Sequence, residues 1–451
     1  MHLVKLTTAG IKNIFTLTIA LSTYTFTIAQ DNSPYSRYGL GDVLSTQNMV
    51  NRSMGGISAG YGAGYNSNPD KPTAFSLNFV NPASLGMVRN TILDLGGEVN
   101  RRTLKSNISP ARFTSTNTVV SYLQFGVPIG TKKMEAKNRT WGASLGIRPV
   151  TRTNYKIEDN NRLSGVDSTS TTYEGSGGIN QVSLSTGIRI NNFSVGITGG
   201  YMFGSRDLST RLSFINDSVF YYRSNIESKS TFGGGFLTAG MLYDIKTRSG
   251  ILRLGAYANL QSKLKARQSI INETFTFNGE GEVISIDTVN FQPEISGDII
   301  YPATYAIGFT HIAKRWLVGA DVEMANWDNY RFYDTKDLVR STYKIKAGVQ
   351  YVPLRDAGSR RYLNLIQYRA GAFLGPDMVK IESNKRSEYG FTFGAGLPLT
   401  TQRFDNLAIL NAGVEFASRG NKQSKSLREN VMRFTLGFSL NAVWFQKRKY
   451  D

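Results

Sequence analysis

Residues 431–444 read VMRFTLGFSLNAVW, a stretch in which apolar and polar side chains alternate almost without exception. One face carries the apolar side chains of Met432, Phe434, Leu436, Phe438, Leu440, Ala442 and Trp444. A period of two is that of a β-strand whose two faces meet different surroundings. The same alternation recurs in residues 316–324 and 388–397. The pattern therefore predicts an all-β protein.

Strand length and connection length distinguish a membrane barrel from a soluble sandwich. About fourteen alternating segments are expected, many close to the ~9–11 residues that cross a bilayer at a tilt. They start near Asn90, Ala111, Arg139, Ile179, Asn192, Lys229, Gly250, Ile300, Trp316, Arg340, Arg361, Arg386, Asp405 and Leu427. Short turns such as 191–192 and 313–315 alternate with longer polar loops, notably 153–178 and 265–297. This parity indicates a transmembrane antiparallel β-barrel over residues 87–451, located in the cell outer membrane.

The first 29 residues are typical of a secretory signal peptide. Lys5 and Lys12 give a positive start, an apolar stretch runs from Ile14 to Ala29, and small residues precede Gln30. A membrane-spanning anchor is the alternative interpretation. The stretch is short and contains several Thr and Ser residues, which favours the signal peptide.

Composition restricts the chemistry that the chain can perform. It has no Cys and only two His, His2 and His311, so disulfides, thiolate metal sites and most histidine chemistry are excluded. We therefore expect no enzyme, no cofactor and no metal. The formal net charge of +19 gathers at the short turns, where it suits inner-leaflet phosphates or an acidic periplasmic protein partner. Outer-membrane lipid and lipopolysaccharide are expected around the barrel. An exported barrel does not meet nucleic acid, which is excluded as a partner.

Residues 30–86 lack the alternation and are rich in Gly, Ser, Asn and Tyr. They cannot bury a core of their own size, so we expect a small N-terminal plug inside the lumen; a disordered leader is the alternative. Aromatic and apolar residues argue for order and are predicted to line a ligand-binding pocket against the wall: Tyr35, Tyr38, Leu40, Phe75 and Phe79.

Three short runs carry a resemblance to a known family. These are Tyr38-Gly39-Leu40-Gly41, the run from Arg52 to Gly56, and Asn81-Pro82-Ala83 followed by Ser84 and Leu85. Together they resemble the plug region of FadL-type transporters, and the secretion partner PorV is similar in architecture. The resemblance implies a plug that ends in the Asn81-Pro82-Ala83 motif and leads into a fourteen-stranded barrel. It also implies transport of long-chain fatty acids or other hydrophobic molecules.

Charged residues at the polar positions of the alternating strands are expected to face the lumen and to pair there. Asp321 and Glu323 lie on the strand next to Lys344 and Lys346, and Arg433 lies on the strand next to Glu415. Mixed neighbouring charges favour structural pairing over an ion-selective pore. Two functions remain open: a passive, plug-gated channel for small hydrophobic molecules, or a structural or interaction barrel such as a secretion-system partner.

Overall fold

The computed structural model describes residues 33–62, 74–106, 112–162, 168–215, 221–278, 283–353, 361–381, 386–399, 406–421 and 427–442. The predicted signal peptide, residues 1–29, lies outside these described residues. No helix within the described ranges is long and apolar enough to cross a membrane.

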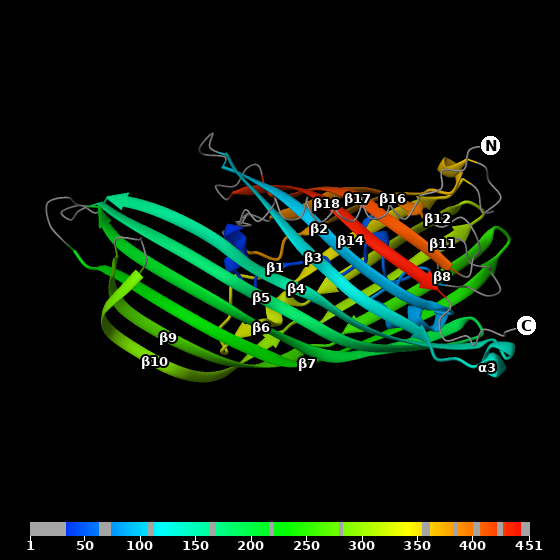
Figure 1. Cartoon of the computed structure of the whole chain (residues 1–451), viewed down its shortest axis with the longest axis horizontal. Coiled ribbons are helices and arrows are strands. Elements are labelled where there is room, and N and C mark those ends of the chain that lie inside the picture. Colours follow the sequence, from blue (N-terminus) through cyan, green and yellow to red (C-terminus); the bar gives the residue numbers. More distant parts are fainter. Residues whose placement is uncertain are drawn as a thin grey trace, which may run out of the picture.

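Antiparallel strands form one closed sheet, because the last strand pairs with the first long one (Figure 1). The long strands are β2 (Thr91–Lys105), β3 (Arg112–Pro128), β4 (Arg139–Arg162), β5 (Ser168–Ile190), β6 (Phe193–Ile215), β7 (Arg223–Thr247), β8 (Gly250–Asn259), β9 (Ser262–Phe277), β10 (Val283–Tyr301), β11 (Thr304–Ala313), β12 (Trp316–Ala325), β14 (Thr342–Tyr351), β15 (Gln367–Pro376), β16 (Ser387–Pro398), β17 (Asn406–Gly420) and β18 (Arg428–Ala442). Two pairs, β8 with β9 and β10 with β11, continue one another along their neighbours, so the barrel has 14 strands. The predicted fold class is confirmed.

The barrel wall is much taller on one side than on the other. Strands β4 to β7, β9 and β10 extend far beyond β12, β14, β15 and β16 (Figure 1). The prediction of loops at 153–178 and 265–297 is therefore wrong: most of these residues belong to the hairpins β4–β5 and β9–β10. Both faces of these hairpins are largely polar, so the alternation disappears although the strand pairing continues.

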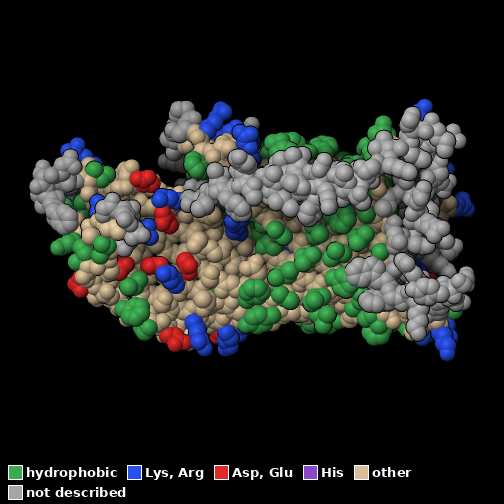
Figure 2. Space-filling model, viewed as in Figure 1, with side chains coloured by type: hydrophobic (Ala, Val, Ile, Leu, Met, Phe, Trp, Pro, Cys, Tyr) green, Lys and Arg blue, Asp and Glu red, His purple; other side chains and the backbone are tan. Residues whose placement is uncertain are grey.

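The outer surface carries an apolar belt at the short-turn end of the barrel. Large apolar side chains stand exposed there on many strands, among them Leu145, Leu184, Ile197, Ile307 and Leu436. Figure 2 shows this green belt over one part of the wall, whereas charged and other polar side chains cover the taller part. Apolar side chains thus point outward and polar ones inward, which is the arrangement of a membrane barrel.

The segment before β2 lies inside the barrel. It contains η1 (Pro34–Arg37), β1 (Asp42–Val43), α2 (Met49–Arg52) and η2 (Pro82–Met87). Other short elements are α3 (Lys132–Ala136), η3 (Trp327–Asn329), β13 (Arg331–Phe332) and η4 (Tyr362–Asn364). The wall is shaped to receive the plug: a Cβ at Gly371 would lie 2.1 Å from the backbone nitrogen of Gly55, which itself has a φ of +68°. Only glycine permits this approach.

Candidate functional site: a plugged lumen with a break in its wall

The Asn81-Pro82-Ala83 motif fixes the plug to the wall. The Asn81 amide donates to the backbone oxygen of Ala59 at 2.7 Å and to those of Met241 and Ala256 at 3.3 Å. Its Oδ1 accepts from the backbone N–H of Ala83 and so caps η2, where Pro82 occupies the first turn. The motif therefore joins two parts of the plug to β7 and β8.

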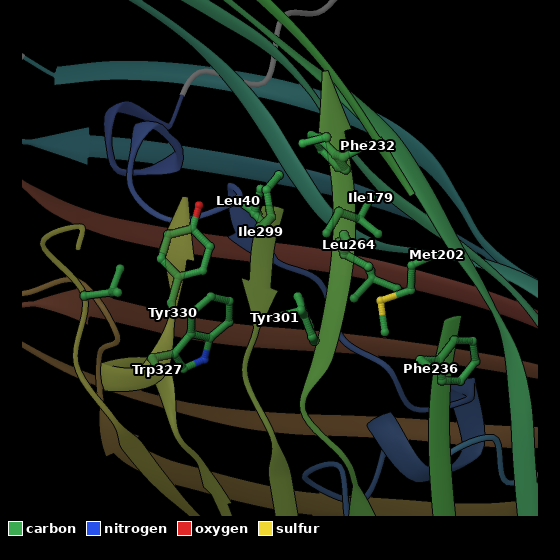
Figure 3. Close-up of a cluster of buried hydrophobic side chains, with 13 residues drawn as sticks. Leu40, Ile179, Met202, Phe232, Phe236, Leu264, Ile299, Tyr301, Trp327 and Tyr330 are labelled. Atoms are coloured by element: carbon green, nitrogen blue, oxygen red, sulfur yellow. The ribbon is translucent and has the colours of Figure 1, made fainter. Parts of the chain in front are cut away.

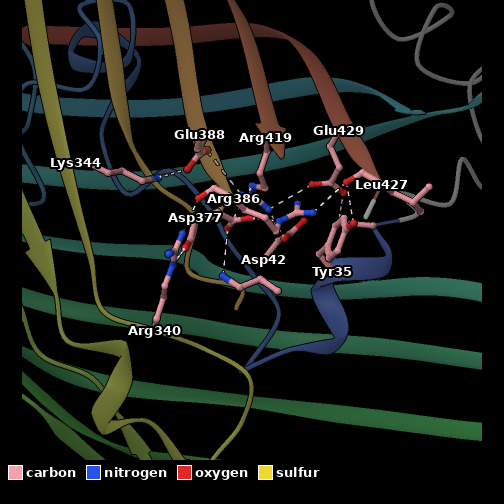
Figure 4. A network of polar contacts seen from close by, with 12 residues as sticks. Tyr35, Asp42, Arg340, Lys344, Asp377, Arg386, Glu388, Arg419, Leu427 and Glu429 are labelled. Atoms are coloured by element: carbon pink, nitrogen blue, oxygen red, sulfur yellow. Dashed lines mark hydrogen bonds and ion pairs between the residues drawn. The ribbon is translucent and has the colours of Figure 1, made fainter. Parts of the chain in front are cut away.

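Ion pairs hold the other end of the plug (Figure 4). The Asp42 carboxylate in β1 contacts the guanidinium groups of Arg102 at 2.8 Å and Arg419 at 2.9 Å. Arg102 also reaches the buried Glu429 at 3.0 Å. Burial raises the pKa of Asp42, but the two guanidinium groups outweigh it and bring this pKa down to about 2. A buried charge that is compensated from two strands holds β1 firmly in place.

The predicted lumen charges lie in the wall and meet carboxylates, though not always the expected ones. Lys346 pairs with Glu323 at 2.8 Å, whereas Lys344 pairs with Glu388 at 2.7 Å. Arg433 contacts Glu415 at 2.5 Å. Glu388, from the next hairpin, is not among the residues predicted from the sequence.

Asp321 has a different role from the other lumen charges. It makes no ion pair among the described residues, and its carboxylate accepts backbone N–H groups of the plug, from Ser58 and, at 2.7 Å, from Ala59. An ion pair makes a second link between the plug and the wall, and it joins Arg52 of α2 to Glu98 of β2. Asp321 and Glu98 thus hold the plug, whereas the other predicted lumen charges pair within the wall.

A chamber of about 220 Å³ remains in the lumen between the plug and wall strands of both the tall and the short side. Its apolar lining comes from several elements: Val43, Leu44, Phe79, Val150, Met202, Tyr257, Tyr301, Trp327 and Phe373. Neutral polar and charged residues line the rest, and most of the charged ones are the paired groups described above. Arg148 differs, because its guanidinium binds the backbone oxygen of Thr46 at 2.6 Å and the side chain of Gln181.

A cluster of buried apolar side chains lies in the lumen on the tall side of the chamber (Figure 3). Leu40 of the plug packs there with Ile179, Phe232 and Leu264 of the wall. The connection between β12 and β14 adds Trp327, Tyr330 and Val339 to the same cluster. The plug thus lies on one side of the chamber, and this cluster of plug and wall residues lies on the other.

The wall itself is interrupted between β3 and β4. Their pairing runs only from Pro128 with Gly142 to Leu123 with Ile147, although both strands continue. A bulge at Ser121 turns β3 away at this height. The plug fills part of the break: Asp42 and Val43 pair with Arg152 and Thr151 of β4, and the Leu44 N–H donates to Val150.

The break opens onto an outward-facing groove of about 630 Å³. Val119 and Val120 of β3, Pro149 of β4 and Phe203 of β6 line it. Leu44 lines both this groove and the inner chamber, and Val150 of β4 lines the chamber while its neighbours Pro149 and Thr151 line the groove. Val43 beside it is 38% exposed, which is unusual for a residue of the plug.

The five residues predicted to bind a ligand do not share one pocket. Phe79 lines the chamber and packs edge-on against Tyr122. Leu40 belongs to the cluster of buried apolar side chains on the tall side of the chamber, and Tyr38 packs against that cluster. Tyr35 donates to the backbone oxygen of Leu427 beneath the Arg386 guanidinium, and Phe75 lines a void of about 10 Å³.

The residues that shape the break were not predicted from the sequence. Leu44 and Val43 lie in a stretch without periodicity, so nothing marked them. The bulge did leave a signal: Val119 and Val120 are adjacent apolar residues that interrupt the alternation in β3. No group of three or more metal-ligating residues occurs within the described ranges, and His311 contacts only Ser249 there.

These features define a class: a plugged, fourteen-stranded membrane barrel with a break in its wall. The BamG family model matches residues 10–451, and the chain belongs to this family. A search of curated proteins finds no match.

Solved structures share the fold at low identity. The CymD monoaromatic hydrocarbon channel is 13% identical with a TM-score of 0.52, covering 90% of this chain and 99% of its own. A Pseudomonas aeruginosa FadL homologue is 12% identical with a TM-score of 0.54, covering 90% and 100%. The Pseudomonas putida toluene transporter TodX is 16% identical with a TM-score of 0.52, covering 89% and 98%. The predicted FadL-type fold is confirmed.

Proposed function

We propose that the protein is a passive outer-membrane channel that passes small hydrophobic molecules between its inner chamber and the membrane through the break between β3 and β4. One observation carries this proposal: among the described residues, Leu44 is the one that lines both the chamber and the outward groove. Movement of β1 away from β4 would join the two spaces. The plug segment is thus the proposed gate, and the apolar belt supports a place for the barrel in the outer membrane.

The lining suits an apolar guest. Each 100 Å² of apolar surface that leaves water contributes about 2.5 kcal/mol, so a one-ring hydrocarbon gains enough to enter the chamber. Most of the chamber's charges are paired with each other, which leaves little to hold an ion. The similar structures include a monoaromatic hydrocarbon channel and a toluene transporter, which supports this class of substrate.

A cysteine at the gate tests the proposal, because the chain has no native Cys. Leu44→Cys is expected to carry a monoaromatic hydrocarbon into intact cells until a charged thiol reagent is added, and a reductant should restore uptake. Val289→Cys, exposed on the tall part of β10, is the matched control and should not respond. The proposal would be contradicted if thiol modification of the Leu44→Cys variant left hydrocarbon uptake unchanged. It would also be contradicted if cells with this variant took up no more hydrocarbon than cells without the protein.

An interaction barrel remains the second candidate, and the outer edge of β10 favours it. Strand β10 pairs with β9 along its length, but on its other side only Ile299 and Ile300 pair, with β13. Residues 284–294 thus have no second strand neighbour within the described residues and expose Ile286, Val289 and Phe291. An extended segment of a partner would pair with such an edge. Thr288→Pro should then remove a co-purifying partner, whereas unchanged co-purification would count against this candidate.

A further inference from the structure

Three basic residues stand side by side on the outer face where β18, β2 and β3 approach the tall end of the barrel. Arg428 is the register partner of Lys105, and Lys105 is the register partner of Arg112. Alternate residues of β2 point inward, because Arg102 and Leu104 are buried, so Lys105 points outward. Like charges directly opposite one another destabilise a sheet. The row therefore needs a compensating anion.

The protein supplies little negative charge there. The Arg428 guanidinium donates to Ser418 at 2.9 Å and to the Tyr389 hydroxyl at 3.2 Å, both neutral groups. Within the described part of the chain, neither Lys105 nor Arg112 forms an ion pair. The sequences of the connections 106–111 and 421–427 contain no Asp or Glu. The nearest acid on β18, Glu429, is fully buried against Arg102.

An apolar groove of about 430 Å³ lies on the same outer face, directly next to the basic row. Tyr389, Phe391, Phe416 and Met432 line it, and Arg101 stands at its border. Arg101 and Met432 are register partners, so the groove spans β16, β17, β18 and β2. The site thus combines an apolar groove on the outer surface with a row of cations at one end of that groove.

The row lies at the height of lipid headgroups. Arg101 lies 10 residues beyond Thr91, where β2 begins, and Lys105 lies 14 residues beyond it. At about 3.3 Å per residue and a tilt of about 40°, these positions are about 25 Å and about 35 Å above the short-turn end. The apolar band of such barrels is about 25 Å tall. By this arithmetic Arg101 lies at the outer boundary of the band, and Lys105 lies in the headgroup layer.

We propose that this surface binds a phosphorylated glycolipid of the outer leaflet, of the lipid A type. An acyl chain occupies the groove beside Phe391, Phe416 and Met432, and the glycolipid phosphates bridge Arg428, Lys105 and Arg112. Phosphates would turn the repulsion along the row into charge-assisted hydrogen bonds, which guanidinium groups form in bidentate fashion. The inference relies on the outer-membrane location proposed above but not on transport, so either can fail alone.

Native mass spectrometry of the detergent-extracted full chain tests the site with diphosphorylated lipid A as the probe. The variant K105Q/R112Q/R428Q removes the row. The matched control K263Q/K265Q/R267Q removes three outward charges from β9, where Asp298 and Glu294 already compensate them. Each cation near a phosphate layer contributes about a fivefold gain in binding, so the triple variant should bind about a hundredfold more weakly and the control almost normally.

Two further probes identify the source of the phosphate. Lipid A without its phosphates should bind the native chain as weakly as the diphosphorylated form binds the triple variant. Inorganic phosphate should not compete at millimolar concentration, because it has no acyl chain for the groove. Equal loss in both triple variants, or unchanged binding of dephosphorylated lipid A, would overturn the proposal. If the triple variant does not fold, Lys105→Gln alone should lower binding about fivefold.

Discussion

Replacing Leu436 with arginine should lower the free energy of unfolding of the barrel, because this side chain faces lipid. Leu436 is 56% exposed and lies between Ala412 on β17 and Gly97 on β2. It lies six residues before Ala442, the end of β18, which places it about 15 Å above the short-turn end at the usual rise and tilt. That height is close to the middle of an apolar band about 25 Å tall.

Arginine near the bilayer midplane costs about 2–4 kcal/mol in such barrels, which lowers the folding constant by about thirty- to a thousandfold. Val289→Arg is the matched control: this apolar side chain is 72% exposed, but it lies on the tall part of β10, beyond the belt. A charge there remains in water and should change stability by less than about 0.5 kcal/mol.

Folding into lipid vesicles across a urea series measures both free energies of unfolding. The expected result is a large loss for Leu436→Arg and almost none for Val289→Arg. Equal losses at the two positions would mean that the apolar belt does not face lipid. The outward-apolar interpretation of the whole barrel would then be refuted.

Three further predictions concern the plug and the orientation of the barrel. Arg102→Ala leaves the carboxylates of Asp42 and Glu429 undercompensated, so it should lower the free energy of unfolding by about 3–5 kcal/mol and raise ion conductance in planar bilayers. The control Arg253→Ala breaks a buried pair with Asp244 within the wall, so it should lower the free energy of unfolding similarly without raising conductance. Because the folded-state pKa of Asp42 is lowered from 3.8 to about 2, its stabilisation is present above pH 4 and is lost as pH falls through 2. The advantage of the native chain over Asp42→Asn in urea unfolding should therefore shrink by about 2 kcal/mol between pH 5 and pH 2, and a constant advantage would contradict the assignment. In intact cells, an impermeant thiol reagent should label Lys265→Cys but not Lys133→Cys, and the reverse labelling would invert the orientation.

The barrel is largely predictable from the sequence because the membrane imposes period two on every strand that crosses it. The expected starts at Arg139, Gly250 and Trp316 are the observed ones. Above the belt, both faces of the wall meet water, so the hairpins β4–β5 and β9–β10 carry no such period and their sequences resemble loops. Their strand pairing depends on backbone hydrogen bonds, which leave little trace in side-chain polarity.

The candidate site was only partly predictable. The alternation of polar and apolar residues predicted that Glu415 and Arg433 face the lumen from neighbouring strands, and they pair there. The partners of Asp321 lie in the plug, whose path inside the lumen has no periodic signal. The role of Leu44 depends on where the plug meets the break in the wall, and that meeting arises only from the closed barrel.

Access of an apolar molecule from the membrane to Trp327 tests the central claim most directly, because Trp327 lines the chamber. Replacing Trp141, Trp316 and Trp444 with phenylalanine leaves Trp327 as the only tryptophan, since the chain has four. A brominated hydrocarbon dissolved in the bilayer should quench its fluorescence, and a charged adduct on Leu44→Cys should slow that quenching while leaving quenching by aqueous iodide unchanged. If the bilayer quencher never reaches Trp327, or reaches it equally fast with the adduct in place, the break between β3 and β4 is not a passage.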